Sequence, residues 1–222
     1  MSIWESRFGY SIRLVMFGAL IAVGCGIPLG VLIAKNPTSG LSRTSSVVLA
    51  ALISIPNFVL GLLMIILLAS HLKIIKVLPD WDSPGSWIVP AIVLAVMPMA
   101  NIARMTLASI TNIMNEDYVR TARAKGLSQT RVTISHVLRN ALVPIITFLG
   151  PTIMEMLTGL LIVENLFSFP GFGRVYWESV LRLDYPMILG LTLVYSTTIM
   201  LVNILIEISC EILDPRIRSI KQ

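Results

Sequence analysis

Few side chains in this sequence suit acid–base, nucleophilic or metal chemistry, and they are spread through apolar segments. The two histidines, His71 and His136, are far apart, and neither a GxxxxGK(S/T) phosphate loop nor an HExxH zinc motif is present. Cys25 and Cys210 each lie inside an apolar run, which favours packing over a disulfide or a zinc site. The sequence therefore predicts no catalytic residue, no metal site, no bound cofactor and no enzyme.

One acidic side chain stands where charge is costly. Glu155 lies near the middle of an apolar run, and ionised groups there usually face the interior of a bundle or a water-filled path. It could line a transport pathway and face the amino group of a solute, or it could be protonated or hydrogen-bonded within the packing. An ion-coupled secondary transporter would use such an acid as a proton or ion site, and this stays open as an alternative function. Glu164, nearer the end of the same run, is predicted to be interfacial.

The elements that must position these residues are long apolar helices. Hydrophobic residues make up 55% of the 222 residues and charged residues only 13%, against roughly 25% charged in a soluble domain. About 20 apolar residues in succession cross a bilayer as a helix. The runs predict an all-α integral membrane protein, a single domain over 1–222, with five spans at about 11–34, 46–70, 87–110, 142–164 and 186–213.

The net charge of +5 fits membrane topology better than nucleic acid, because Lys and Arg stand almost entirely between the runs and line no aromatic groove. Ten of the seventeen fall in the first and third connections and the tail: Lys35, Arg43, Arg120, Arg123, Lys125, Arg131, Arg139, Arg216, Arg218 and Lys221. Because basic loops stay cytoplasmic, the N-terminus is predicted outside the cell and the C-terminus in the cytoplasm. A lipid bilayer is expected as a partner, and nucleic acid is not.

The connection at 115–141 carries the strongest local signals. Asn115 can cap a short helix, Asp117 suits its positive end, and Gly126 can take the left-handed conformation that ends it. Ser128 can cap a second helix, whose apolar residues recur on one face. From periodicity alone, two interpretations stay open: an ordered helix pair that contacts a partner, or a charged loop that only sets topology.

Within this connection, DYVRTARAKGL from Asp117 to Leu127 resembles the cytoplasmic coupling loop of a known family, the inner-membrane permeases of binding-protein-dependent ABC importers. The general pattern there is Glu-Ala-Ala, three residues, Gly, nine residues and Ile-x-Leu-Pro. Here Arg120, Thr121 and Ala122 stand at Glu-Ala-Ala, Gly126 at the glycine, and His136, Val137, Leu138 and Arg139 at the last four positions. These departures are ones that the peptide and nickel branch of the family shows.

Two further stretches resemble that branch, specifically its oligopeptide/dipeptide permease B-type subunits. They are VENLFSFPGFGRVYWESVLRLDY, from Val163 to Tyr185, and DPRIR, from Asp214 to Arg218. Members usually begin with a further membrane helix, and this chain starts about where their second helix would. It is therefore expected to lack the first membrane helix, and a shortened permease that assembles without transporting stays open as an alternative.

The resemblance implies a type I ABC-importer arrangement with short cytoplasmic coupling helices, in the inner membrane of a bacterium. A second homologous permease subunit would complete the pathway for a peptide or a related solute such as nickel, and a soluble extracytoplasmic binding protein would deliver that solute. ATP would be hydrolysed by ABC ATPase subunits and not by this chain. The implied coupling residues are Asp117, Arg120, Thr121, Ala122, Arg123, Ala124, Lys125, Gly126, Leu127, His136, Leu138 and Arg139.

The segment 167–185 is expected on the outer face. Its Pro-Gly-Phe-Gly turn leads into an aromatic-rich stretch, which suits a helix at the lipid headgroups. Such a helix could be a membrane anchor alone, or it could also dock the binding protein. The candidate docking residues are Pro170, Gly171, Gly173, Arg174, Trp177 and Glu178. Asp184, just before Pro186, is a suitable start for the last helix.

Overall fold

The structure is a computed structural model, and it describes residues 3–36, 39–75, 80–124, 126 and 137–213. The regular elements of this described part are all helical, as the fold class predicted. They are α1 (Ile3–Ala34), α2 (Gly40–Ser54), α3 (Asn57–Met64), η1 (Ile65–His71), η2 (Pro84–Trp87), α4 (Ile88–Met114), α5 (Asp117–Ala124), α7 (Arg139–Leu166), α8 (Phe172–Leu181) and α9 (Tyr185–Leu213).

Four helical segments are long and apolar enough to cross a membrane: Arg7–Ala34, Pro84–Met114, Asn140–Leu166 and Tyr185–Ile208. A fifth crossing is made if the pair Gly40–Ser54 and Asn57–His71, which bends by 99°, counts as one. This pair covers the span predicted at about 46–70. Pro56 explains the bend, because the residue before a proline is driven out of the helical region, and Ile55 is extended at φ −87° and ψ 118°.

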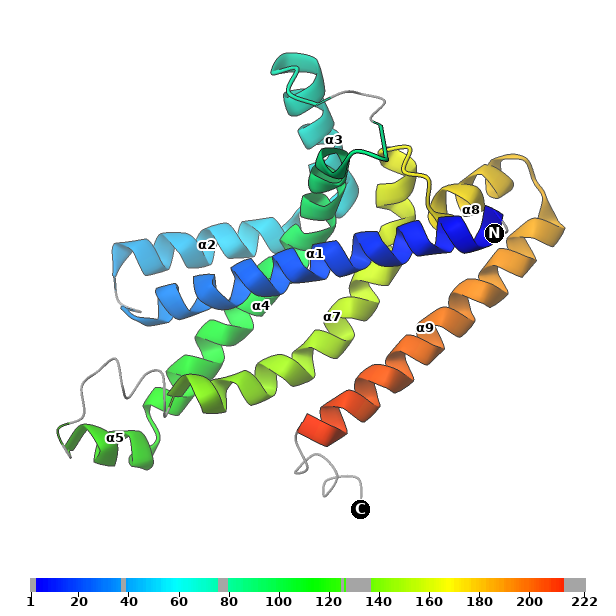
Figure 1. Ribbon diagram of the computed structural model, residues 1–222. Helices are drawn as coiled ribbons and strands as arrows, with labels where there is room; N and C mark the ends of the chain where they lie inside the picture. The colour runs from blue at the N-terminus through cyan, green and yellow to red at the C-terminus, as the bar shows by residue number, and fades with distance from the viewer. Residues whose placement is uncertain (1–2, 37–38, 76–79, 125, 127–136, 214–222) are drawn as a thin grey trace.

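The centre of the bundle is α4, which packs against α1 along much of its length and against α7 (Figure 1). Gly30 of α1 allows the close approach. A Cβ built there would lie 2.5 Å from the carbonyl oxygen of Ala103 and 2.5 Å from Thr106 Cβ, both in α4. The pair Gly26 and Gly30 thus has the spacing and position of a GxxxG contact between membrane helices.

The last helix lies at the edge. Its apolar window is only 6% buried by the rest of the described chain, against 56% for the window in Pro84–Met114. Asp184 caps this helix, since its Oδ1 accepts a hydrogen bond from the backbone N–H of Met187 at 3.1 Å. The expected start of the last helix is therefore confirmed.

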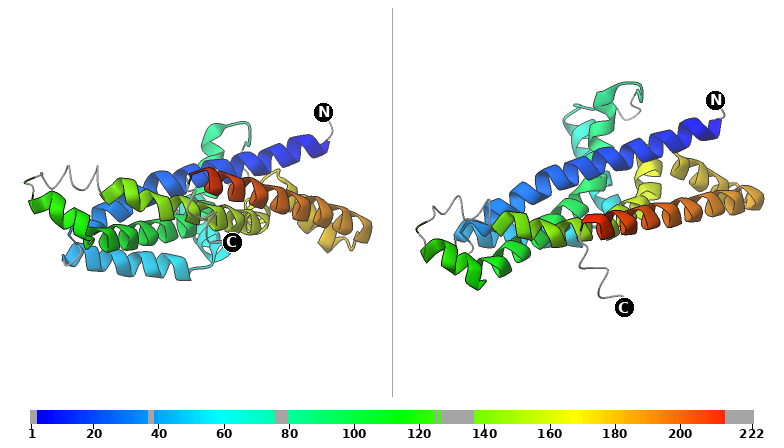
Figure 2. Two further views of the ribbon diagram at one scale, coloured as in Figure 1. Left: turned by 90° about the horizontal axis from the view of Figure 1, so that it is seen from below. Right: turned by 60° about the horizontal axis from the view of Figure 1, so that its bottom comes forward.

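The two short helices that carry the candidate sites lie at opposite ends of the molecule (Figure 2). Helix α5 follows α4 at one end, and α8 lies at the other end beside the start of α1 (Figure 1). Helix α7 connects the ends: its 28 residues make it roughly 42 Å long at 1.5 Å per residue.

Candidate functional site

Helix α5 is held against the end of the bundle by one apolar face. Val119 is fully buried and Ala122 is 7% exposed. The cluster beneath α5 consists of these two residues with Ala34, Ile110, Val137 and Ala141. The side-chain amide of Asn140 also donates a hydrogen bond to the Tyr118 hydroxyl at 3.0 Å. The helix thus shares one apolar cluster with residues of α1, α4 and α7, and it contacts α4 and α7 directly.

The opposite face of α5 is polar and open. Asp117, Arg120, Thr121 and Ala124 are exposed and recur at i, i+3, i+4 and i+7. Arg120 and Asp117 lie 4.0 Å apart, but their side chains are 72% and 99% exposed, so the pair stabilises the helix little. This face is free to contact another protein. Ala122, by contrast, packs on the bundle and does not belong to the open face.

Gly126 has φ +78°, the left-handed conformation expected of it, and an added Cβ would meet no heavy atom within 4 Å. Glycine is favoured here by the left-handed backbone conformation and not by a lack of room for a side chain. The remaining residues of the predicted coupling loop are described only in part. Lys125, Leu127 and His136 lie outside the described residues, as do the second short helix expected after Ser128 and the stretch 214–218. The side chains of Arg123 and Arg139 also lie outside the description, and Leu138 is half-buried.

At the other end, the Pro-Gly-Phe-Gly segment folds α8 back over the end of α7. Phe169, fully buried, anchors this turn. Its ring makes edge contacts with Trp81, Trp87 and Tyr10, at centroid distances of 4.8, 4.9 and 6.0 Å. Such aromatic pairs contribute to stability beyond the area they bury. The turn is therefore a fixed part of the fold.

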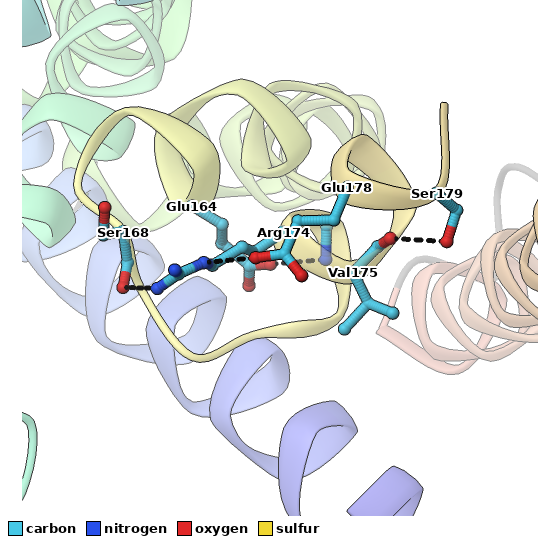
Figure 3. Close-up of polar contacts among 7 residues, drawn as sticks. Glu164, Ser168, Arg174, Val175, Glu178 and Ser179 are labelled. Atoms are coloured by element: carbon cyan, nitrogen blue, oxygen red, sulfur yellow. Dashed lines mark hydrogen bonds and ion pairs between the residues drawn. The ribbon is translucent and has the colours of Figure 1, made fainter. Parts of the chain in front are cut away.

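The candidate docking residues divide into an outer and an inner group. Arg174 donates from Nε to Glu178 Oε1 at 2.9 Å and from Nη1 to the Ser168 carbonyl at 2.8 Å (Figure 3). Arg174, Trp177 and Glu178 present partly open side chains, with Trp177 47% exposed. Pro170 is half-buried, and Gly171 and Gly173 are buried. Gly171 and Gly173 therefore offer no side chain to a partner, whereas the other four residues can.

The buried glycines surround a residue whose burial and contacts the sequence did not show. Glu164 lies near the end of α7, and the protein encloses it completely, with 0% exposed; its predicted interfacial position stays a prediction. Its Oε2 accepts from the Gly173 N–H at 2.6 Å (Figure 3), and its Oε1 accepts from the Ser11 hydroxyl at 2.5 Å. A Cβ at Gly171 would overlap the carboxylate. The only signal in the sequence is the glycine pair that follows Glu164 within nine residues.

Glu155 is turned away from the rest of the chain. It belongs to an exposed stripe of α7 that also holds Pro151, Thr158 and Ile162, at i, i+4, i+7 and i+11. Among the described residues it has no hydrogen-bond or ion-pair partner. The stripe can therefore face a pathway or a neighbouring subunit.

Nothing in the described part of the chain is arranged for metal chemistry, since no three His, Cys, Asp or Glu side chains come together there. What the geometry offers is two accessible surfaces joined by membrane helices: a polar one on α5, and a mixed one on α8, where Arg174 and Glu178 accompany exposed Trp177, Val180 and Leu181. The family model described as the inner membrane component of binding-protein-dependent transport systems matches residues 26–219. The chain belongs to this family.

Several family members are similar over nearly the whole chain. The dipeptide transport system permease protein DppB of Bacillus subtilis (strain 168) is 40% identical over 218 residues, which is 98% of this chain and 70% of the relative. DppB of Escherichia coli (strain K12) is 35% identical over 252 residues, 99% of this chain and 74% of the relative. The oligopeptide permease AppB of Bacillus subtilis (strain 168) is 36% identical over 225 residues, 96% of this chain and 70% of the relative. These permeases confirm the predicted branch of the family.

Solved structures show the same fold. A chain of the inward-facing MetNI methionine ABC transporter superposes with a TM-score of 0.77 at 16% identity, over 96% of both chains. A chain of an amino acid ABC transporter superposes with a TM-score of 0.70 at 18% identity, over 94% of this chain and 93% of that one. The predicted type I importer fold is confirmed.

Proposed function

We propose that this chain is a permease subunit of an ATP-driven, binding-protein-dependent importer and forms the membrane pathway for dipeptides or oligopeptides with a second homologous subunit. The observation that carries the proposal is the 40% identity with a dipeptide permease over 98% of the chain. The chain itself binds no cofactor in this proposal, and partner ABC ATPase subunits hydrolyse ATP.

Helix α5 is the coupling element in this proposal. Its open face, which includes Asp117, Arg120 and Thr121, sits in a groove of the ATPase subunit. Because its other face packs on α1, α4 and α7 at once, a displacement of α5 moves all three helices. The individual exposed ion pairs contribute little, so shape and rigid attachment carry the coupling.

The exposed stripe of α7 lines the pathway. Glu155 faces the amino group of the peptide there, with Thr158 one turn further along. An acid at the bilayer centre is tolerated when it meets a water-filled path. The absence of a polar partner for Glu155 in the described chain supports a contact outside it.

Helix α8 lies on the outer face of the bacterial inner membrane and docks the soluble binding protein. The N-terminus, which lies beside α8 (Figure 1), is then outside, and α5 and the C-terminus are cytoplasmic. Arg174, Trp177 and Glu178 supply the contact surface. An Arg and a Trp on one short helix are typical of residues that dominate protein interfaces.

The test is uptake by the complete transporter in proteoliposomes loaded with ATP. We expect a labelled dipeptide to accumulate only when ATP is inside and the binding protein is outside. Uptake that follows an ion gradient without ATP would instead support an ion-coupled carrier using Glu155. A complex that assembles but takes up no dipeptide, oligopeptide or nickel would support a shortened, assembly-only permease.

A further inference from the structure

We propose that Glu164 is a positioning residue that ties α8 to α1 and α7, so that docking of the binding protein on α8 reaches the membrane helices. The inference rests on the proposed role of α8 as the docking surface. It concerns the Glu164 junction, which comprises Ser11, Glu164, Gly171, Phe172 and Gly173.

The junction joins three helices through one carboxylate. Glu164 comes from the end of α7, Ser11 from the start of α1, and Gly173 from the first turn of α8. The Ser11 hydroxyl donates to Glu164 Oε1 at 2.5 Å and accepts the Phe172 N–H at 2.9 Å. Glu164 Oε2 accepts the Gly173 N–H at 2.6 Å. Two free N–H groups at the start of α8 are thus satisfied by side chains of the other two helices.

A buried carboxylate would be energetically unfavourable if this site served only to pack the helices together. Burying an ionised group that has no cationic partner is unfavourable. Among the described residues, no basic side chain forms an ion pair with Glu164. The guanidinium of the nearby Arg174 instead bonds Glu178 and the Ser168 carbonyl, and it is the backbone N–H of Arg174 that hydrogen-bonds Glu164. When Glu164 is ionised, its charge is stabilised by the N-terminal N–H groups of α8 and by the Ser11 hydroxyl, which makes their separation from Glu164 costly in turn.

The packing around the junction leaves α8 little freedom to move alone. A Cβ at Gly173 would lie 2.8 Å from Leu161 Cα, so the backbones of α8 and α7 are in close contact. The Phe172 ring lies between Phe8 of α1 and Tyr195 of α9, with both centroid distances at 6.3 Å. A force on α8 therefore passes to α1, α7 and α9.

Helix α7 gives this force a direct route to the other end of the molecule. It holds Glu164 near its last turn, and it contacts α5 near its first turn through Ala141 and the Asn140 amide. One continuous helix thus connects the docking helix with the coupling helix. We infer that, through this junction, docking of the binding protein on α8 stimulates ATP hydrolysis by the ATPase subunits.

The experiment uses the assembled transporter with its ATPase subunits and its binding protein. Glu164→Gln keeps the volume but replaces one of the two acceptor oxygens by an NH2 group, so that either the Gly173 N–H or the Ser11 hydroxyl faces a donor, and Ser11→Ala removes the shared hydroxyl. Ser179→Ala is the matched control, because Ser179 is also buried but its hydroxyl bonds only within α8, to the Val175 carbonyl. The measurements are basal ATPase rate, stimulated ATPase rate and affinity for the binding protein.

We expect Glu164→Gln and Ser11→Ala to retain assembly, basal ATPase rate and affinity for the binding protein. Stimulation should fall about tenfold, the scale set by losing a hydrogen bond to a charged acceptor. The double variant should be no worse than the worse single variant, because both remove one connection. Ser179→Ala should be stimulated like the wild type.

Stimulation of Glu164→Gln and Ser11→Ala at the wild-type level would overturn the inference while leaving the docking proposal intact. A wild-type transporter that neither binds nor responds to the binding protein would instead overturn the role of α8, and this inference with it. If Glu164→Gln does not assemble, Ser11→Ala decides the question by the same two rates.

Discussion

Two acids of α7 show how position on a helix decides the role of a residue. Glu155 and Glu164 are nine residues apart, and at 100° per residue this spacing places them on opposite faces. Glu155 is exposed, whereas Glu164 is 0% exposed and hydrogen-bonded to two other helices. The first is therefore suited to contact a solute, and the second to hold the fold.

At this scale we expect Glu155→Gln to raise the KM for dipeptide uptake about tenfold, because a hydrogen bond between two charged groups is replaced by a weaker one. The ATPase rate should change little. Initial uptake rates at several peptide concentrations measure the effect. An N-acetylated dipeptide, which has no amino charge, is the control and should be transported equally by both proteins. Unchanged KM and unchanged substrate preference would remove Glu155 from the pathway.

At the scale of elements, short helices depend on backbone conformations that only certain residues adopt. The helix α5 is followed by Gly126 at φ +78°, and left-handed backbone costs an L-residue about 1–2 kcal/mol. In the membrane, α1 depends on the missing side chain of Gly30 for its contact with α4. Both glycines shape an element, for different physical reasons.

Gly126→Val should change the path of the chain after α5 and so uncouple ATP hydrolysis from transport. We expect ATPase activity to persist while peptide uptake per ATP falls severalfold. Gly40→Val is the control, because Gly40 likewise stands at a helix end beside a chain connection but has no left-handed φ and no atom within 4 Å of a built Cβ. Equal coupling ratios in the two variants would contradict the role given to the bend.

Gly30→Ala should destabilise the bundle, because its new methyl group collides with the backbone of α4. Overpacking of this kind costs about 1–3 kcal/mol, so the thermal midpoint of the purified protein should fall. Gly24→Ala lies in the same helix, with nothing within 4 Å of its Cβ, and should leave the midpoint unchanged. Equal midpoints for the two variants would show that α1 and α4 are not held at this distance.

At the scale of the whole molecule, the accessible surfaces of α5 and α8 lie at opposite ends of α7, and so the proposed orientation places them on opposite sides of the membrane. Helix α8 then meets the exterior and α5 the cytoplasm. The charge distribution in the sequence agrees, because α5 belongs to the basic connection that the sequence predicts to be cytoplasmic.

This orientation is tested by labelling single cysteines in intact cells after Cys25 and Cys210 have been replaced by serine. We expect Trp177→Cys to react with a membrane-impermeant maleimide added outside. Ala124→Cys, which is also exposed in the structure, should react only after the cells are opened. The reverse pattern would place α5 outside and end the proposed contact with a cytoplasmic ATPase.

The sequence by itself determined the membrane class, the helical fold and the family. Long apolar runs leave no soluble alternative, and the separated motifs at 117–127 and 163–185 indicate one branch of one family. The left-handed bend at Gly126 and the Asp184 cap were also predictable, because both depend on residues close together in the chain.

Only the tertiary structure decided the 99° break at Pro56, the inward position of Ala122 and the burial of Glu164. A proline in a membrane helix is compatible with either a straight or a broken helix, and neighbouring helices select between them. Glu164 meets Ser11 across 153 positions of sequence. No local pattern encodes such a contact, because it exists only once α8 has folded over the ends of α1 and α7.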